Sequence, residues 1–151
     1  MSVRSVNIVD WISYILFRLA EGIISVIPMR ICYWIGSLSG QLLFYLLKKY
    51  RSLAIRNLRF AYGDSHSESE LAKLAKLHFS TLGANFLCSV KITTLSSERI
   101  EDYVEFEGTE YLQRSEIEKT PVIYLTPHMG AWELLAQIKS VAPSIKLGAI
   151  Y

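Results

Sequence analysis

Cysteine and net charge are both scarce in this chain of 151 residues. Its two cysteines, Cys32 and Cys88, lie far apart in apolar surroundings, which excludes a disulfide framework and a cysteine-rich metal cluster. We expect both thiols to be reduced and to face the cytoplasm. The 16 Lys and Arg against 14 Asp and Glu leave a formal net charge of +2, so a nucleic-acid-binding function has no global electrostatic support.

Internal repeats and low-complexity segments are absent as well, and the length allows one domain at most. Apolar residues are abundant instead. They make up 51% of the chain, and the mean hydropathy of +0.25 is high for a freely soluble domain of this size. The apolar excess is concentrated in the first third of the chain.

Two apolar segments, Ile8–Ile27 and Ile31–Leu47, account for this excess. Each is close to the roughly 20 residues that span a bilayer, so the pattern predicts membrane-associated helices and leaves open whether one or both cross it. Arg18 and Glu21 interrupt the first segment at the i,i+3 spacing of an ion pair. A charge at a bilayer centre costs about 2.5–3.5 kcal/mol, which favours a shallow first helix and argues against a signal peptide.

Basic residues follow the second segment directly: Lys48, Lys49, Arg51, Arg56 and Arg59. The positive-inside tendency puts such a cluster on the cytoplasmic side of a membrane. We therefore interpret residues 1–50 as a membrane-associated helical segment on that side. Within it, Gly36 and Gly40 have a small-xxx-small spacing that permits close helix packing.

A helix is predicted after Ser67, because Ser67 and Glu70 have the spacing of a capping box. The apolar residues that follow it recur at helical intervals: Leu71, Leu74, Ala75, Phe79, Leu82 and Phe86. His78 shares this face, and we interpret it as a hydrogen-bonded histidine of the core. His66 lies in a polar loop, where we expect it to be solvated.

Strands and helices alternate beyond residue 100. Strands are predicted at Tyr103–Glu107, Val122–Thr126 and Leu147–Tyr151, and helices at Thr109–Glu118 and Trp132–Val141. Short connections between strand, helix and strand favour parallel pairing. We therefore predict an α/β fold, with N-terminal membrane-associated helices followed by the first part of a mixed or parallel sheet with flanking helices. Residues 51–151 would form this incomplete α/β domain.

The most informative stretch is a β-prone run that ends in Thr-Pro and is followed at once by His128. Turns from strand to helix are where α/β proteins carry reactive side chains. Four residues separate His128 from Glu133, so a carboxylate can reach the imidazole and orient it as a general base. Gly130 permits close approach of the backbone, and Trp132 supplies a rigid wall.

Two other interpretations of His128 compete with catalysis. One is a hydrogen-bonded structural histidine. The other is a metal site, but His128 and Glu133 are only two ligands, and a zinc site needs three or four from the protein. No metal is predicted.

The block from Leu125 to Leu135 resembles the signature of the bacterial lipid A biosynthesis acyltransferases, which carry His-x4-Asp/Glu. Three further stretches are similar to the family: Arg51–Leu58, Ser67–Leu71 and Glu105–Gly108. The two apolar segments separated by Pro28 agree with it too. The resemblance covers nearly the whole chain, although Tyr62-Gly63 stands where the family usually has Phe-Pro.

The resemblance implies a transfer of a fatty acyl chain to a hydroxyl of a membrane glycolipid, a lipid A precursor, without a cofactor. The implied donor is an acyl carrier protein or acyl-CoA, and the implied location is the cytoplasmic face of the bacterial inner membrane. His128 would be the general base and Glu133 its partner. Gly130, Trp132, Arg51 and Arg56 are candidates for substrate binding. A different glycolipid acceptor stays open, because the resemblance does not separate acceptors.

Family members are considerably longer than this chain and carry an essential arginine in the part that would follow Tyr151. We therefore expect the 151-residue piece alone to be inactive. The alternative functions are a catalytically dead, membrane-anchored remnant and a membrane-bound interaction module in which the His128 block is structural.

Overall fold

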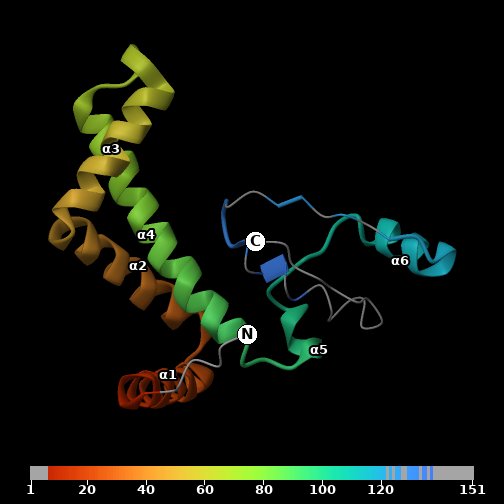
Figure 1. Cartoon of the computed structure of the whole chain (residues 1–151). Helices are drawn as coiled ribbons and strands as arrows, with labels where there is room; N and C mark the ends of the chain where they lie inside the picture. The colour runs from red at the N-terminus through yellow and green to blue at the C-terminus, as the bar shows by residue number, and fades with distance from the viewer. Residues whose placement is uncertain are drawn as a thin grey trace. The chain divides into compact units, whose positions relative to one another are not determined.

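The computed structural model describes residues 7–121, 123, 125, 126, 129–132, 134, 135 and 137. Its elements are α1 (Ile8–Val26), α2 (Met29–Leu46), α3 (Lys48–Tyr62), the 3-10 helix η1 (Gly63–Ser65), α4 (Glu68–Ile92), α5 (Ser97–Ile100) and α6 (Thr109–Glu118) (Figure 1). The chain forms two compact units, Met1–Thr94 and Leu95–Tyr151. Each unit is described by itself below.

The prediction of an α/β fold is wrong for the described residues, which form helices and no strand. The predicted strand Tyr103–Glu107 is a turn followed by irregular chain, and the described residues 123, 125 and 126 are irregular too. An alternating pattern reports one half-buried face, but a strand also needs a neighbour that takes up its backbone hydrogen bonds. The predicted strand Leu147–Tyr151 and most of the predicted helix Trp132–Val141 lie outside the described residues.

The two apolar segments form α1 and α2, with Pro28 at the N-cap of α2. None of the helices in the described part of the chain is both long and apolar enough to cross a membrane, which corrects the expectation of transmembrane helices. The predicted ion pair is present, because the Arg18 guanidinium contacts the Glu21 carboxylate. At the start of α1, Asn7 and Asp10 cap each other's backbone N–H groups at 2.9 and 3.0 Å.

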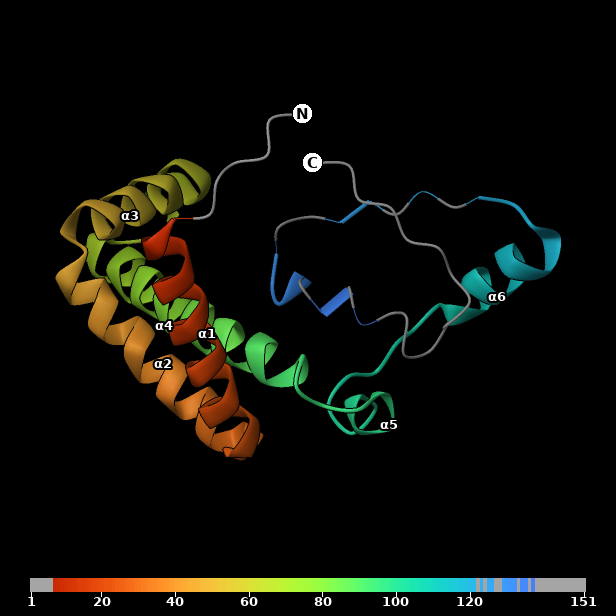
Figure 2. The same cartoon turned by 60° about the horizontal axis from the view of Figure 1, so that its bottom comes forward.

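The core of the first unit is the contact between α2 and α4, which run antiparallel and side by side (Figure 2). Three glycines bring the two backbones together. A Cβ added to Gly40 would lie 2.0 Å from the Phe79 carbonyl oxygen, and one added to Gly83 would lie 2.2 Å from the Gly36 carbonyl oxygen. The predicted close packing through Gly36 and Gly40 is therefore confirmed, and Gly83 is the partner that the sequence pattern did not identify.

Polar side chains fill the seam beside these glycines. The hydroxyls of Ser37 and Ser80 lie 2.6 Å apart, and the Gln41 amide donates to the Ser80 hydroxyl at 3.4 Å. Ser80 is buried, so these bonds meet the requirement that a hydroxyl removed from water keeps a partner. Towards α3, Phe44 is buried and packs edge to face on Phe79, with 5.6 Å between the ring centroids.

The helix predicted after Ser67 is confirmed as α4, and so is its capping box: the Ser67 hydroxyl accepts from the Glu70 N–H, and the Glu70 carboxylate accepts from the Ser67 N–H at 2.8 Å. The predicted core face is only partly right. Leu71 and Ala75 are buried, whereas Leu82, Phe86 and His78 are exposed. The contact with α2 selects small residues, because only they allow the backbones to approach, and this turns the larger apolar side chains outwards.

The glycine contact predicts a clear stability difference between two glycines. Gly40→Ala should lower the free energy of unfolding by about 1–3 kcal/mol or more, because the new methyl group meets backbone atoms that cannot move aside. Gly22→Ala in α1 is the control. A Cβ there meets nothing within 4 Å, so the better helix propensity of alanine should leave stability unchanged or slightly higher. Denaturant unfolding of both variants checks this, and equal effects would contradict the packing described.

The capping box predicts a dependence of stability on pH. The Ser67 hydroxyl and then the Ser67 N–H, both bonded to the Glu70 carboxylate, lower the pKa of Glu70 below its ordinary value of 4.5. A lowered pKa in the folded state stabilises the fold above pH 4.5, and this contribution is lost as the pH falls through the folded-state value. Glu70→Gln should therefore lose less stability than the unchanged protein between pH 6 and pH 3, which thermal unfolding across the pH range measures. Identical slopes would exclude this role of Glu70.

Candidate functional site

The two arginines proposed for substrate binding lie on different sides of α3. Arg51 is half-buried, and its guanidinium carbon lies 5.5 Å from the centroid of the Phe44 ring, a cation–π contact inside the helical unit. Arg56 is exposed. At about 100° per residue, positions five apart on a helix diverge by about 140°, so the two side chains do not converge on one ligand. Arg51 acts as a packing residue.

His128 and Glu133 lie outside the described residues, so their role as base and partner stays a prediction. The described residues between them carry part of the geometry that the sequence suggested. Gly130 has a φ of +65°, in the left-handed region that favours glycine, and a Cβ there would meet nothing within 4 Å. Directly after it, the Leu134 N–H donates to the Ala131 carbonyl at 2.9 Å and closes a turn. The positive φ is the described feature that favours glycine at this position, and close approach of a neighbour stays a prediction.

Trp132, the predicted wall, lies within this turn and is 38% exposed. Gly130 and Trp132 belong to the unit Leu95–Tyr151, and Arg51 and Arg56 belong to the unit Met1–Thr94. Gly130 and Trp132 share one short segment because they are two residues apart in the sequence, and Arg51 and Arg56 share helix α3.

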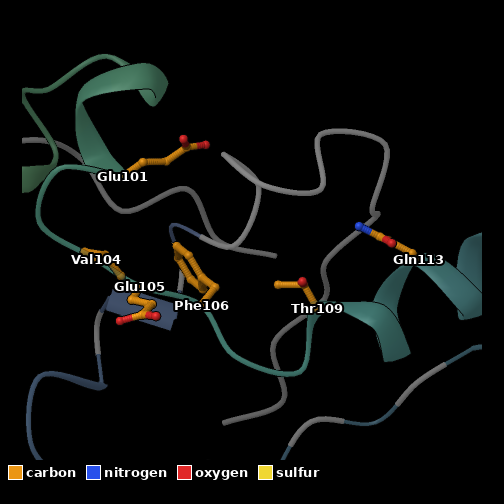
Figure 3. Close-up of a pocket in the computed structure, with 6 residues that line it drawn as sticks. All are labelled: Glu101, Val104, Glu105, Phe106, Thr109 and Gln113. Carbon is orange, nitrogen blue, oxygen red and sulfur yellow. The ribbon is translucent and has the colours of Figure 1, made fainter.

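A cleft of about 410 Å³ opens in the second unit (Figure 3). It is lined by Glu101, Val104, Glu105, Phe106, Thr109 and Gln113. The last two come from the first turns of α6, and Val104 to Phe106 come from the irregular segment that precedes it. Gly108 allows the chain to turn between these two parts, because its φ of +76° suits a residue without a Cβ.

The chemistry of this cleft differs from that of the predicted site. Its charged side chains are the carboxylates of Glu101 and Glu105, which accept hydrogen bonds from hydroxyl or ammonium groups and repel phosphates. Gly130 and Trp132, the described residues of the predicted site in this unit, are not among its lining residues. The sequence resemblance had singled out Glu105–Gly108, and the structure adds Thr109 and Gln113 to that stretch.

The two remaining histidines are not arranged for acid–base catalysis. His78 is exposed, and its ring lies edge to face with that of Phe79 at 6.4 Å between centroids, which corrects its interpretation as a core histidine. His66 is half-buried rather than fully solvated. Its ring lies 4.6 Å from that of Tyr62, and its Nδ1 lies 2.9 Å from the Ser65 hydroxyl.

Both cysteines are free thiols. Cys32 is fully buried, and burial, with a smaller effect of Cys32, raises the pKa of the Cys88 thiol. A raised pKa keeps the Cys88 sulfur protonated at neutral pH, and a protonated thiol is a poor nucleophile and metal ligand. Within the described part of the chain, no three His, Cys, Asp or Glu side chains are grouped so that they could hold a metal ion.

Lys91 makes a contact between two helices that the sequence analysis did not predict. It is 7% exposed, and its ammonium donates to the carbonyl oxygen of Ser25 in the last turn of α1. A cation at the C-terminal end of a helix is favourable, because the unpaired carbonyls there carry partial negative charge. Lys91 therefore attaches α1 to the end of α4. The sequence feature that could have indicated a buried lysine is its position between two apolar residues, Val90 and Ile92.

Comparison with known proteins gives a single finding of similarity. A family model described as bacterial lipid A biosynthesis acyltransferase matches residues 2–146, nearly the whole chain. None of the curated proteins and none of the solved structures compared with the chain matches it. The match spans both units and includes the His128 block.

Proposed function

The chain belongs to the bacterial lipid A biosynthesis acyltransferase family, and we propose that it moves a fatty acyl chain from a thioester to a hydroxyl of a lipid A precursor. The donor is an acyl carrier protein or acyl-CoA. The observation that carries the proposal is the family match over residues 2–146, which contains the His128-x4-Glu133 block.

The chemistry assigns His128 the role of general base. A hydroxyl is a poor nucleophile at neutral pH, so its proton passes to the His128 imidazole as its oxygen attacks the thioester carbonyl carbon. The tetrahedral intermediate then expels the thiolate, which takes the proton back from the imidazolium. Glu133 accepts a hydrogen bond from the second ring nitrogen, sets the tautomer and stabilises the imidazolium.

Two observations support direct transfer between donor and acceptor. Within the block, the described Gly130 has a positive φ, and the Leu134 N–H bonds to the Ala131 carbonyl, so a turn follows the sequence position of the proposed base. The thiols supply no competing nucleophile, because Cys32 is buried and burial raises the pKa of Cys88. An acyl-enzyme would need an activated serine or cysteine, and neither residue type stands beside His128 in the sequence.

Replacing His128 tests this mechanism. His128→Ala should lower kcat by about 10²–10⁴-fold with little change in KM, because the base acts in the transition state and not in binding. His78→Ala, which removes an exposed histidine of α4, is the matched control and should keep full activity. The measurement is transfer of a labelled acyl chain to a lipid A precursor by the gene product that carries this chain. Full activity of His128→Ala would contradict the assignment. So would a variant that folds poorly but whose remaining folded protein keeps its specific activity.

We also propose that the protein works at the cytoplasmic face of the bacterial inner membrane and binds the surface through α1. This helix has no buried residue. One side of it carries an apolar stripe at helical spacing, and each member is more than half exposed: Ile8, Ile12, Ile15, Leu19, Ile23 and Val26. The Arg18–Glu21 ion pair lies outside this stripe, on a side that also carries the exposed rings of Tyr14 and Phe17. An amphipathic helix of this kind lies in the plane of the interface, with its apolar side among the acyl chains.

A charge in the α1 stripe should weaken this binding. Leu19→Asp is expected to reduce partitioning into vesicles of phosphatidylethanolamine and phosphatidylglycerol by about tenfold or more, because an apolar side chain of this size contributes about 1.5–3 kcal/mol when it leaves water. Ser13→Asp adds the same charge outside the stripe and should have a much smaller effect. Flotation of the two variants gives the comparison, and equal losses would show that α1 does not insert by this side.

A further inference from the structure

The α3 helix carries positive charge without compensation inside the helix. Between Lys48 and Tyr62 there are five basic residues and no Asp or Glu: Lys48, Lys49, Arg51, Arg56 and Arg59. Two of them have partners within the protein, because Arg59 pairs with Glu68 of α4 and Arg51 packs on Phe44. No carboxylate in the described part of the chain pairs with Lys49 or Arg56.

The side of α3 that contains Lys49 and Arg56 alternates basic and apolar residues. Lys49, Leu53, Arg56 and Phe60 follow one another at intervals of four, three and four residues, which aligns them on one side of a helix. All four are exposed, Leu53 by 41% and Phe60 by 94%. We call these four residues the α3 stripe. A phenylalanine so fully exposed is not part of any core, and beside unpaired cations it is typical of a recognition surface.

The opposite side of α3 is the one that packs in the helical unit. Arg51, Ala54, Ile55 and Leu58 are half-buried and lie on that side. Helix α3 contacts α4 and α2. The α3 stripe therefore points away from both helices and is available to a partner.

The position of α3 argues against a membrane as that partner. Helix α1 is attached at the C-terminal end of α4 through Lys91, and α3 meets the N-terminal end of α4 through Arg59 and Glu68 (Figure 1). At about 1.5 Å per residue, the 23 steps from Glu68 to Lys91 correspond to about 35 Å. With α1 on the membrane, the Phe60 end of the α3 stripe is therefore separated by this length of α4 from the point where Lys91 attaches α1.

We propose that the α3 stripe is the docking surface for an acidic helix of a carrier protein that delivers the acyl thioester, a proposal that rests on the function proposed above. An acidic amphipathic helix matches the stripe in both respects. Its carboxylates pair with Lys49 and Arg56, and its apolar side chains cover Leu53 and Phe60. Acyl-CoA has no apolar helix to cover these side chains, so the stripe distinguishes a protein-bound donor from a free one.

Reversing the charges of the basic residues and removing an apolar side chain test the two kinds of residue in the α3 stripe separately. The double variant Lys49→Glu/Arg56→Glu should weaken binding of purified acyl carrier protein by about tenfold or more at low salt, with the loss shrinking as salt screens the charges. Phe60→Ser should weaken the same binding without changing its salt dependence. The control is Lys73→Glu/Arg99→Glu, which reverses two exposed charges outside the stripe and should bind as the unchanged protein does. Circular dichroism confirms that each variant is folded.

Kinetics then separate this proposal from the proposed function. With the complete enzyme, the stripe variants should lower kcat/KM for the carrier-bound acyl donor about tenfold relative to kcat/KM for an acyl-pantetheine thioester. If the unchanged protein transfers from neither donor, the proposed function fails, while direct binding of acyl carrier protein still reports on the stripe. Carrier binding that is unaltered in both stripe variants overturns the docking surface. If the stripe variants no longer float with phosphatidylglycerol vesicles but bind the carrier as before, the docking proposal is overturned too, and the stripe is assigned to the membrane.

Discussion

The close contact between α2 and α4 is the constraint on which the rest of the first unit depends. Carbonyl oxygens of one helix occupy the space where the other would carry a Cβ at Gly36, Gly40 and Gly83. Contact at this distance adds dispersion attraction along two backbones, but it leaves no room for large side chains between them. The buried apolar residues of the unit are accordingly few and sit beside the seam, among them Cys32, Phe44, Ala75 and Ala84.

A thin core of this kind leaves many apolar residues outside it, and their distribution accounts for the two surfaces to which we assign binding roles. Helix α1 is bonded to α4 near its C-terminal end, where Lys91 donates to the carbonyl of Ser25, and none of its residues is buried, so its apolar stripe is exposed to a lipid interface. Helix α3 packs through one side and offers basic and apolar residues on the other. The two surfaces lie at opposite ends of α4, which suits an enzyme that meets a membrane acceptor and a soluble donor.

The catalytic proposal has a different basis from the two surfaces. It comes from the family match and from the residue types of the His128 block, and the structure contributes the left-handed Gly130 and the turn that follows it. The acidic cleft at Glu101 and Glu105 is chemically unlike a phosphate-binding site, so nothing assigns it to the lipid A precursor. The roles of His128 and Glu133 therefore stay predictions from the sequence and the family.

Local signals in the sequence determined the helices α1, α2 and α4, the capping box at Ser67, the Arg18–Glu21 pair, the close packing at Gly36 and Gly40, and the family, whereas helix α3 was not predicted. These depend on residues a few positions apart, whose geometry a helix sets by itself. Only the tertiary structure decided the absence of strands among the described residues, the side of α4 that is buried, and the roles of Gly83 and Lys91. Each of these depends on a partner distant in the sequence. Hydrogen bonds between strands and contacts between helices join residues that are far apart in the chain. No local pattern specifies which distant residue will supply them.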